Sequence, residues 1–489
     1  MRELRVTTTQ GADTGLEETV VEAFQAGLRG ELLRPGNEGY EEARKIHNAM
    51  IDRRPALIAR CAGVADVLSA VRFAREHDLL VSVRSGGHGM PGFAVCDGGL
   101  MIDLARMKGV HVDPNNRTVR AEAGVTWAEF DHETQAFSLA TTGGVVGSTG
   151  IAGLTLGGGH GFLMRRHGLA CDNLLALDLV TADGRWLRAS ATEHAELFWG
   201  LRGGGGNFGV VTSFLFRAHP VTTVYAGPIF WEIEHAREIM AWYRDFLPQA
   251  PRRLYPFLGL KRVPSAEGFP REHWGRRVCA LISCYDGPAA DGVAAMKRVR
   301  GELPAPILDG MAEMPFPVLQ GLFDPLLPKG LQWYWKGDYV KELPDAAIEA
   351  HLEHASRVPE GLSLMHLYPI DGAVHEVASD ATAWSCRDAT WSMVIAGIHP
   401  DPAKAGTITR WAKDYWAAVH AFNPGGAYVN FMMADEGAAR VRATYGPNYA
   451  RLAEVKAKYD PGNLFRVNQN IEPAGAGAAA RSTGRRPQG

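Results

Sequence analysis

A histidine surrounded by glycines is the first candidate for chemistry in this sequence. Residues 81–93 read VSVRSGGHGMPGF, so His88 follows a short β-branched run and stands in a glycine-rich loop. Glycine accepts positive φ and lets the backbone approach a bound molecule closely. The pattern permits two interpretations: a turn that exposes a histidine, or a loop that contacts a large ligand with which the imidazole reacts.

Three separated glycine clusters suggest an extended ligand. They occupy residues 86–89, 143–161 and 203–209. The last contains a GxGxxG pattern, but the following segment VVTSFLFRA predicts a strand, whereas a dinucleotide fingerprint opens a helix. Backbone amides of several such loops can together bind an anionic group, and we expect a pyrophosphate.

Five motifs carry a family resemblance. They are RSGGHG (84–89), the 157–184 segment beginning GGGHGFLMRRHG, LFWGLRGGGGNFGVVTSF (197–214), YVNFMMADEG (428–437) and YDPGNLFRVNQNI (459–471). In this order they resemble the berberine-bridge-like FAD oxidoreductases of the vanillyl-alcohol-oxidase type, especially the bacterial members, over residues 40 to 472. The resemblance implies an α+β fold. Its FAD-binding domain has two parts, and an antiparallel-sheet substrate domain flanked by helices is inserted between them.

The resemblance also implies the cofactor and its contacts. His88 stands where family members bond the 8α-methyl carbon of FAD through an imidazole nitrogen, which requires a neutral ring. The other matching FAD-contacting positions are Arg84, Ser85, Gly86, Gly87, Gly89, Thr149, Gly150, Gly153, Gly158, Gly159, Asn207, Gly209, Val211, Asn468 and Asn470.

A second covalent bond to the flavin is not expected. In family members that have one, the bonding cysteine precedes the GGGxG turn, and this position is Val146 here. Cys171 lies beyond the turn, so we predict a packed thiol and a single linkage through His88. The family's oxygen-gating position aligns near Thr149, which is about as small as valine.

Oxidation of an alcohol or amine requires a base, and the resemblance assigns it to Tyr428. Tyr428 and Asn430 share one face if YVNF is a strand. A phenol has a pKa of about 10, so we expect a neighbouring charge or hydrogen bond to lower it. The alternative is a tyrosine that only packs in the core.

Other residues are weaker candidates for substrate contact. The glutamate base of the plant enzymes aligns near Met393 and is therefore missing. His366, Tyr368 and Arg387 are candidates for the substrate pocket, although packing explains the first two equally well.

The elements that must position these residues follow from periodicity. Residues 55–61 and 81–85 predict strands, and residues 63–79 have the apolar spacing of a helix, which together make a β-α-β unit. A further helix is expected from about Trp127. These elements belong to a predicted first part of the FAD-binding domain at 40–222, after an N-terminal extension at 1–39.

The middle of the chain has a different pattern. Residues 223–427 contain apolar strands such as TVYAGPIFWEI, RVCALISCYD and WSMVIAGIH, with helices AREIMAWYRDFL and TRWAKDYWAAVHAF between them. This predicts the substrate domain. Residues 428–473 contain a helix that ends near Asp460 and then strand-like residues that return to the first part. The tail at 474–489 is expected to be disordered.

Composition excludes several classes of protein. The 489 residues have a net charge of −3, which argues against a dedicated nucleic-acid binder. We expect no signal peptide, no membrane span and therefore a cytoplasmic protein. The six cysteines form no CxxC pair, so free thiols are expected, and no recognised metal-binding spacing occurs.

These observations favour an FAD-dependent oxidase that acts on a hydroxyl- or amine-bearing small molecule, with O2 as electron acceptor. A dehydrogenase of the same architecture that uses another acceptor is the alternative. An inactive flavin-binding protein is a third possibility, against which the presence of both His88 and Tyr428 counts. The sequence identifies neither the substrate nor the oligomeric state.

Overall fold

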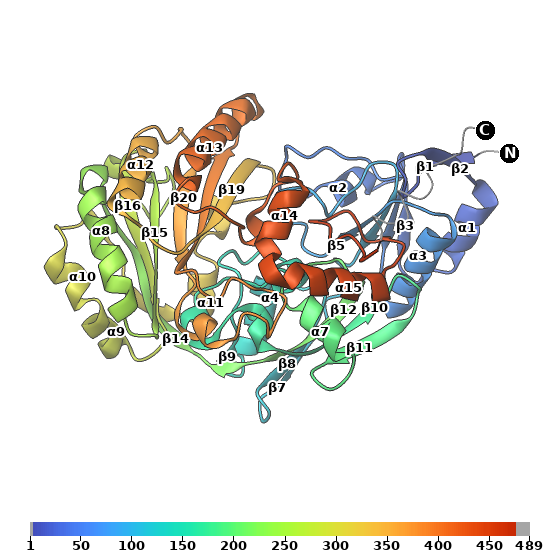
Figure 1. The fold of residues 1–489 in the computed structure, drawn as a ribbon, viewed down its shortest axis with the longest axis horizontal. Coiled ribbons are helices and arrows are strands. Elements are labelled where there is room, and N and C mark those ends of the chain that lie inside the picture. Colours follow the sequence, from blue (N-terminus) through green and yellow to red (C-terminus); the bar gives the residue numbers. More distant parts are fainter. Residues whose placement is uncertain (1–2, 476–489) are drawn as a thin grey trace, which may run out of the picture.

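The structure is a computed structural model that describes residues 3–475. Figure 1 shows two halves side by side: the N-terminal elements form one, and the strands and helices from β14 (Thr223–Glu232) to α13 (Ala405–His420) form the other. The C-terminal helix α15 (Tyr449–Tyr459) lies against the N-terminal half, and α14 (Gly437–Tyr445) lies between the two halves. Residues 476–489, most of the tail predicted to be disordered, lie outside the described residues.

The N-terminal half contains the predicted β-α-β unit. Strand β4 (Leu57–Arg60), helix α3 (Val64–Glu76) and strand β5 (Val81–Arg84) follow one another, which confirms these three predicted elements. Strand β6 (Leu100–Asp103) pairs in parallel with both β4 and β5, and β3 (Glu31–Leu33) adds an antiparallel edge. The glycine loop with His88 leaves this sheet at the end of β5.

An antiparallel sheet of five strands completes this half, in the order β11-β10-β12-β8-β7. Its strands are β7 (Val110–Asp113), β8 (Thr118–Glu122), β10 (Leu174–Val180), β11 (Trp186–Ser190) and β12 (Val210–Arg217). Strand β12 directly follows the glycine cluster at 203–209. As predicted, the GxGxxG pattern is therefore followed by a strand and not by the helix that a dinucleotide-binding fingerprint would open.

Short helices surround the two sheets. Helix α4 (Trp127–Gln135) begins where predicted, because Thr126 and Glu129 form a capping box that satisfies its first amides. The other small elements of this half are β1 (Glu3–Thr7), β2 (Asp13–Glu17), α1 (Glu18–Ala26), α2 (Tyr40–Arg44), β9 (Leu139–Ala140), α5 (Ile151–Leu156), α6 (Met164–His167), α7 (Ala195–Leu201) and β13 (His219–Pro220).

The second half is built on an eight-stranded antiparallel sheet. Its central order is β17-β14-β16-β15-β20-β21-β19, and β18 pairs with β14. The strands are β14 (Thr223–Glu232), β15 (Leu254–Arg262), β16 (Arg277–Tyr285), β17 (Leu308–Asp309), β18 (Ala312–Pro315), β19 (Gln332–Val340), β20 (Leu364–Pro369) and β21 (Trp391–His399).

Helices cover one face of this sheet and leave the other face for a cavity. Gly397 of β21 packs so closely on α13 that a Cβ there would lie 2.5 Å from the carbonyl oxygen of Ile408, whereas Ala396 lines the cavity. Alternate residues of a strand face opposite sides, which explains the difference. The helices of this half are α8 (Ala236–Phe246), α9 (Ala289–Ala295), α10 (Lys297–Glu302), α11 (Phe316–Gln320), α12 (Asp345–Ala355) and α13 (Ala405–His420).

The C-terminal segment returns to the N-terminal half without forming a strand. Helices α14 (Gly437–Tyr445) and α15 (Tyr449–Tyr459) are followed by irregular chain, so the expected strand-like return is wrong. Its backbone groups bond to side chains instead of a neighbouring strand. The buried ammonium of Lys456 pairs with Asp460 and donates to the carbonyls of Asn207 and Phe465.

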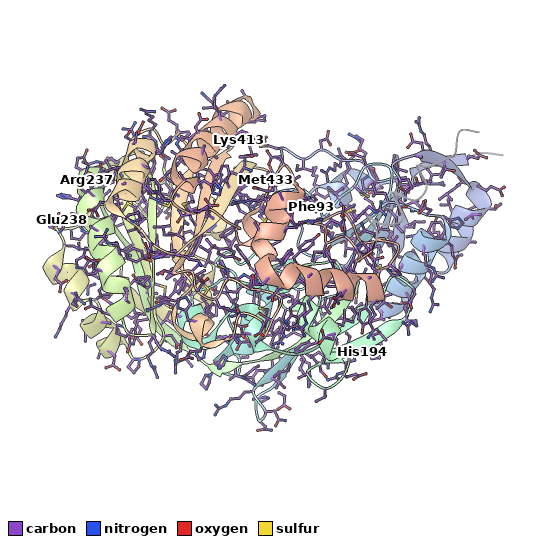
Figure 2. The ribbon with its side chains drawn as sticks, in the orientation of Figure 1. Phe93, His194, Arg237, Glu238, Lys413 and Met433 are labelled. Carbon is purple, nitrogen blue, oxygen red and sulfur yellow. The ribbon has the colours of Figure 1, made fainter. Side chains whose placement is uncertain are left out.

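Figure 2 places Arg237 and Glu238 on α8 at the outer end of the second half, while Phe93 and Met433 lie in the middle of the molecule. The strand β14 starts at the expected boundary residue, Thr223. The division of the chain at 222/223 and 427/428 stays a prediction. Between residues 3 and 475, no helix combines the length and the apolar character that a membrane crossing requires.

Candidate active site

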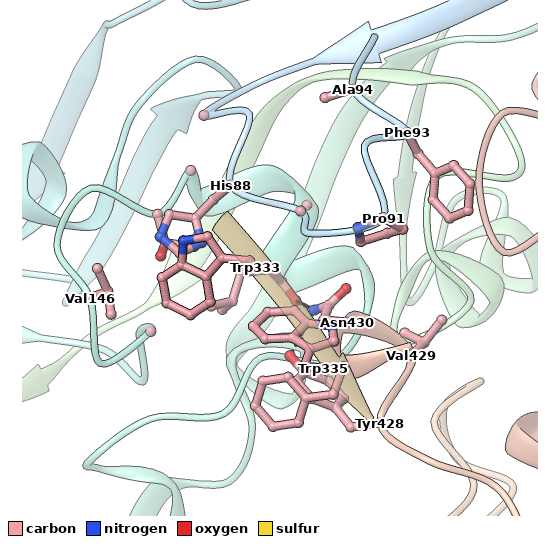
Figure 3. A pocket seen from close by; sticks show the side chains of 18 of the residues that line it. His88, Pro91, Phe93, Ala94, Val146, Trp333, Trp335, Tyr428, Val429 and Asn430 are labelled. Atoms are coloured by element: carbon pink, nitrogen blue, oxygen red, sulfur yellow. Dashed lines mark hydrogen bonds between the residues drawn. The ribbon is translucent and has the colours of Figure 1, made fainter. Parts of the chain in front are cut away.

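A cavity of about 380 Å³ lies between the two halves, within the size range of about 300–1,000 Å³ that ligand pockets have. The glycine loops form one side, at residues 85–89, 144–154 and 205–207, together with the return segment at 465–469. Strands β15, β19, β20 and β21 form the other side. Figure 3 shows His88 and Val146 near Trp333, with Tyr428, Asn430 and Trp335 beyond it.

His88 lines the cavity and is held by a second histidine. Its ring stacks on that of His47, with centroids 4.0 Å apart. The Nε2 atom of His88 is buried and has no hydrogen-bond partner among residues 3–475. Burial lowers the pKa of His88 well below 6.5 and that of His47 to about 4. Both rings are therefore neutral at pH 7, as a nucleophilic imidazole must be.

The glycines of the loops leave room that side chains would fill. The loops approach each other so closely that a Cβ on Gly150 would lie 2.4 Å from the amide nitrogen of Gly86. Gly89, Gly153 and Gly206 line the cavity, and a Cβ on any of them would meet no described atom within 4 Å. This side of the cavity is therefore a backbone surface with open space above it, suited to a flat or extended ligand.

Tyr428 and Asn430 lie together on the cavity wall, although not through a strand: Val429–Phe431 is a short 3-10 helix that Tyr428 precedes. Asn430 Nδ2 donates to Tyr428 Oη at 2.7 Å, and the amide of Gly159 donates to the same oxygen at 3.0 Å. Burial raises the pKa of Tyr428 above 10, and it outweighs the hydrogen bonds from Asn430, Gly159 and His160, which lower it. The expected donors are present, but the net shift has the opposite sign to our expectation because the phenol is fully enclosed.

His160 is a cavity residue that the sequence analysis missed. It is the histidine of GGGHG, and its ring stacks on Tyr428 with centroids 3.7 Å apart. Both ring nitrogens are buried without a hydrogen-bond partner in the described part of the chain, and burial lowers the pKa of His160 to about 3. The ring is neutral and forms part of the surface that a bound ligand would contact.

Aromatic and apolar side chains form most of the opposite wall. Trp333 and Trp335 of β19 line it, and Phe431 contacts both Trp335 and Tyr428, with ring centroids 5.3 and 4.9 Å apart. His366 and Tyr368 of β20 line it as well, so these two candidates do face the cavity. The distance between His366 Nδ1 and Tyr368 Oη is 2.9 Å.

Among the predicted cofactor contacts, Ser85, Gly86, Gly87, Gly89, Thr149, Gly150, Gly153, Asn207 and Asn468 line the cavity. Gly158 and Gly159 stand behind Tyr428: a Cβ on Gly158 would lie 2.9 Å from the Trp384 ring, and Gly159 donates to Tyr428. Gly209 directly precedes β12 and Val211 lies at the start of that strand, and both are outside the cavity lining. Asn470 also lies outside the lining, and its Oδ1 is buried without a partner within residues 3–475.

Two predicted arginines serve the fold and not the cavity. Arg84 forms an ion pair with Asp103 of the neighbouring strand. Arg387 forms a two-bond pair with Asp172, both at 2.7 Å, and lies over the Trp384 ring. Neither lines the cavity. A buried guanidinium needs a carboxylate to compensate its charge, and each of these arginines pairs with one outside the cavity. The assignment of Arg387 to the substrate pocket is therefore not supported.

The position expected for a second flavin-bonding cysteine holds Val146, and Val146 lines the cavity. Cys171 is fully buried outside the lining, and burial raises the pKa of its thiol. Met393 is also buried on the other face of β21, while its neighbour Val394 lines the cavity. Val394, an apolar side chain, is therefore the residue that β21 presents to the cavity beside the position at which the plant enzymes have a glutamate.

Two further residues at or behind the cavity carried little signal in the sequence. His47 stands behind His88 and outside the cavity lining; it lies 41 residues before His88 in the chain, and only the tertiary structure brings the two rings together. Lys261 lines the cavity, but in the sequence it is only one of two adjacent basic residues, with Arg262, at the end of the apolar strand LYPFLGLKR. The motif GGGHG was the available signal for His160.

Comparisons with known proteins agree with this architecture. The family described as "FAD binding domain" matches residues 55–190, and the family "Berberine and berberine like" matches residues 427–472. These two segments come from opposite ends of the chain, and both contribute residues to the cavity lining.

Whole-chain relatives support the same assignment. The (R)-6-hydroxynicotine oxidase of Paenarthrobacter nicotinovorans is 31% identical over 93% of this chain and 99% of its own. An FAD-linked oxidoreductase of Dictyostelium discoideum is 30% identical over 93% of this chain and 97% of its own. The crystal structure of 6-hydroxy-D-nicotine oxidase from Arthrobacter nicotinovorans superposes with a TM-score of 0.82 at 28% identity, covering 91% of this chain and 98% of that one. This chain therefore belongs to the berberine-bridge-like family of FAD-linked oxidoreductases.

Proposed function

We propose that this FAD-dependent oxidoreductase is an oxidase with a single covalent flavin linkage, through His88, that oxidises a hydroxyl- or amine-bearing small molecule with O2 as electron acceptor. The observation that carries the proposal is the position of His88. It is a half-buried, neutral imidazole at the cavity wall, and its buried Nε2 atom has no hydrogen-bond partner among the described residues.

The residues present fit FAD. The open space above Gly89, Gly153 and Gly206 lies on the same side of the cavity as His88, and side chains there would obstruct a flat ring. A covalent linkage would join an imidazole nitrogen of His88 to the 8α-methyl carbon of FAD; each atom would lose one hydrogen, and O2 would take up the two electrons released. Val146 offers no thiol for a second bond.

When bound, FAD supplies the acceptor for a hydride from the substrate carbon. The protein then has to accept the proton of the hydroxyl or amine, and Tyr428 is the proposed base. Asn430 and the amide of Gly159 both donate to Tyr428 Oη, so they hold this oxygen in place and stabilise its ionised form. Thr149, a small residue in the lining, leaves access for O2.

The test of the linkage is acid precipitation of the purified protein. We expect wild-type flavin to remain with the precipitate, and flavin of His88→Ala to stay in the supernatant. His132→Ala is the matched control, because His132 is exposed on α4. Flavin released by acid from the wild type would show that the linkage is wrong.

The electron acceptor is tested separately. Oxygen consumption upon addition of a substrate that bleaches the flavin anaerobically is expected of an oxidase. Bleaching without re-oxidation by O2, together with turnover by an artificial acceptor such as a quinone, would identify a dehydrogenase.

A further inference from the structure

A buried lysine that has no counter-ion among the described residues stands in the cavity wall formed by the second half. Lys261 of β15 lines the cavity and is 7% exposed. Among residues 3–475, no carboxylate lies within ion-pair distance of its ammonium group, and no acceptor forms a hydrogen bond with it. Other buried lysines differ: Lys456 pairs with Asp460, and Lys336 pairs with Glu436.

A histidine with a free nitrogen lies beside this lysine. Strands β15 and β20 pair so that Lys261 is opposite Leu364 and Gly259 is opposite His366. A Cβ on Gly259 would lie 2.8 Å from the His366 ring, so the glycine makes room for the imidazole. His366 Nδ1 is engaged with Tyr368, while its Nε2 is buried without a partner in the described part of the protein.

The surroundings of these two groups are apolar. Leu364 is opposite Lys261 on β20 and pairs with Ala396 of β21, and the other apolar residues of the cavity lining include Phe323, Leu326, Leu327, Leu362 and Ile398. A buried charge is costly unless an opposite charge or hydrogen bonds compensate it. Because the described residues provide no anion at Lys261, a ligand with an anionic group would gain the whole favourable interaction with its ammonium group.

We propose that the substrate carries a carboxylate on an apolar body, and that this carboxylate binds the ammonium of Lys261 and the Nε2–H of His366. The inference rests on the proposed function, since it names the substrate class of the same cavity. Tyr368 donates its hydroxyl proton to His366 Nδ1 in the tautomer that leaves Nε2–H as a donor. A single cation suits a singly charged carboxylate better than a phosphate dianion.

The anion site and the proposed base lie at different places along one wall. Three ring-to-ring steps lead from Tyr428 to Phe431, then to Tyr368 and then to His366, with centroid distances of 4.9, 5.8 and 5.4 Å. The oxidised carbon near Tyr428 and the carboxylate at Lys261 therefore belong to separate ends of the substrate. The apolar body between them contacts the aromatic wall.

The titration of Lys261 provides a signature of the site. Burial lowers its pKa to about 8, so the group is still mostly charged at pH 7. The titratable groups beside it stay neutral from pH 7 to 9.5, because the pKa of His366 lies well below 6.5 and that of Tyr368 lies above 10. In this window Lys261 alone of the three changes its charge.

The test compares a matched acid and amide as probes of the flavin-loaded protein. Binding of 3-phenylpropanoate and 3-phenylpropanamide is measured at pH 7 by calorimetry and by the perturbation of the flavin spectrum. We expect the acid to bind about 10- to 100-fold more tightly than the amide, as a charge-assisted contact provides. Lys261→Met should abolish this preference, Lys261→Arg should retain it, and Lys404→Met, at an exposed lysine, should leave it unchanged.

Equal binding of acid and amide to the wild type would overturn the proposal, as would failure to bind either or a preference that survives in Lys261→Met. If Lys261→Met fails to fold, the wild type still decides: its affinity for the acid must fall about tenfold per pH unit above the pKa of Lys261, while that for the amide stays constant. A flat profile would overturn the proposal. Failure of the proposed function has a different readout: acid precipitation would release the flavin, and this result does not depend on whether the protein prefers 3-phenylpropanoate to 3-phenylpropanamide.

Discussion

Replacing Tyr428 by phenylalanine removes one oxygen atom that accepts two hydrogen bonds. Asn430 Nδ2 and the amide of Gly159 donate to it at 2.7 and 3.0 Å. General-base assistance contributes about 10²–10⁴-fold in rate, which corresponds to about 3–5 kcal/mol of barrier. We expect Tyr428→Phe to slow flavin reduction by this factor while it retains the covalent flavin. Each buried donor left unpaired should also lower the free energy of unfolding by about 1–3 kcal/mol.

The assay is stopped-flow bleaching of the flavin under anaerobic conditions, with a saturating concentration of the best substrate from a panel of apolar hydroxy and amino acids. Tyr445→Phe is the matched control. Tyr445 also lines the cavity and is buried, but its hydroxyl has no hydrogen-bond partner within residues 3–475. Its removal should change the rate of reduction by less than threefold and the free energy of unfolding by at most about 1 kcal/mol.

The pH dependence provides a second measurement on the same variants. Because the pKa of Tyr428 lies above 10, the phenolate is the minor form at neutral pH. Its fraction grows about tenfold per pH unit below that pKa, so the wild-type rate of reduction should rise steeply from pH 7 to pH 9, and the rise should be lost in Tyr428→Phe. A Tyr428→Phe variant that reduces within about threefold of wild type would refute the assignment of this tyrosine as the base. Equal slowing in Tyr445→Phe would refute it too.

Three more predictions follow from the cavity and its surroundings. Cys171→Ser should retain flavin bonded to the His88 peptide alone, and a cysteinyl-flavin peptide in mass spectrometry would contradict the single linkage. Gly150→Ala should lower both flavin content and thermal stability, because the new Cβ would lie 2.4 Å from the Gly86 amide; full flavin loading at unchanged stability would contradict the close loop contact. The free energy of unfolding should fall as pH drops from 6.5 to 5.5, by up to about 1.4 kcal/mol for each buried histidine. Burial lowers the pKa of His160 and His351 to about 3, so in this pH range the unfolded chain binds protons that the folded chain does not. Chemical unfolding at the two pH values measures this, and no change would mean that these histidines are accessible to protons in the folded protein.

Local patterns in the sequence were sufficient for much of the fold. The β-α-β opening, the capped start of α4 and the strand after the 203–209 glycines are set by apolar spacing, a capping box and glycine conformations within a few residues. The return segment after α15 was mispredicted because its apolar residues resemble a strand. Its amides and carbonyls are instead satisfied by distant side chains such as Lys456 and Asn207, which periodicity does not show.

The sequence by itself was sufficient to select His88, from its glycine-rich motif, and Tyr428 and Asn430, from the motif YVNF, and all three line the cavity. Only the tertiary structure decided which charged side chains face the cavity. Arg387 is directed away to Asp172, whereas Lys261 enters the cavity without a partner among the described residues. The alternation of a strand places residues on one of two faces, but which face borders the cavity depends on how the eight-stranded sheet packs against its helices. That packing is a property of the whole sheet, and no single segment of the sequence contains it.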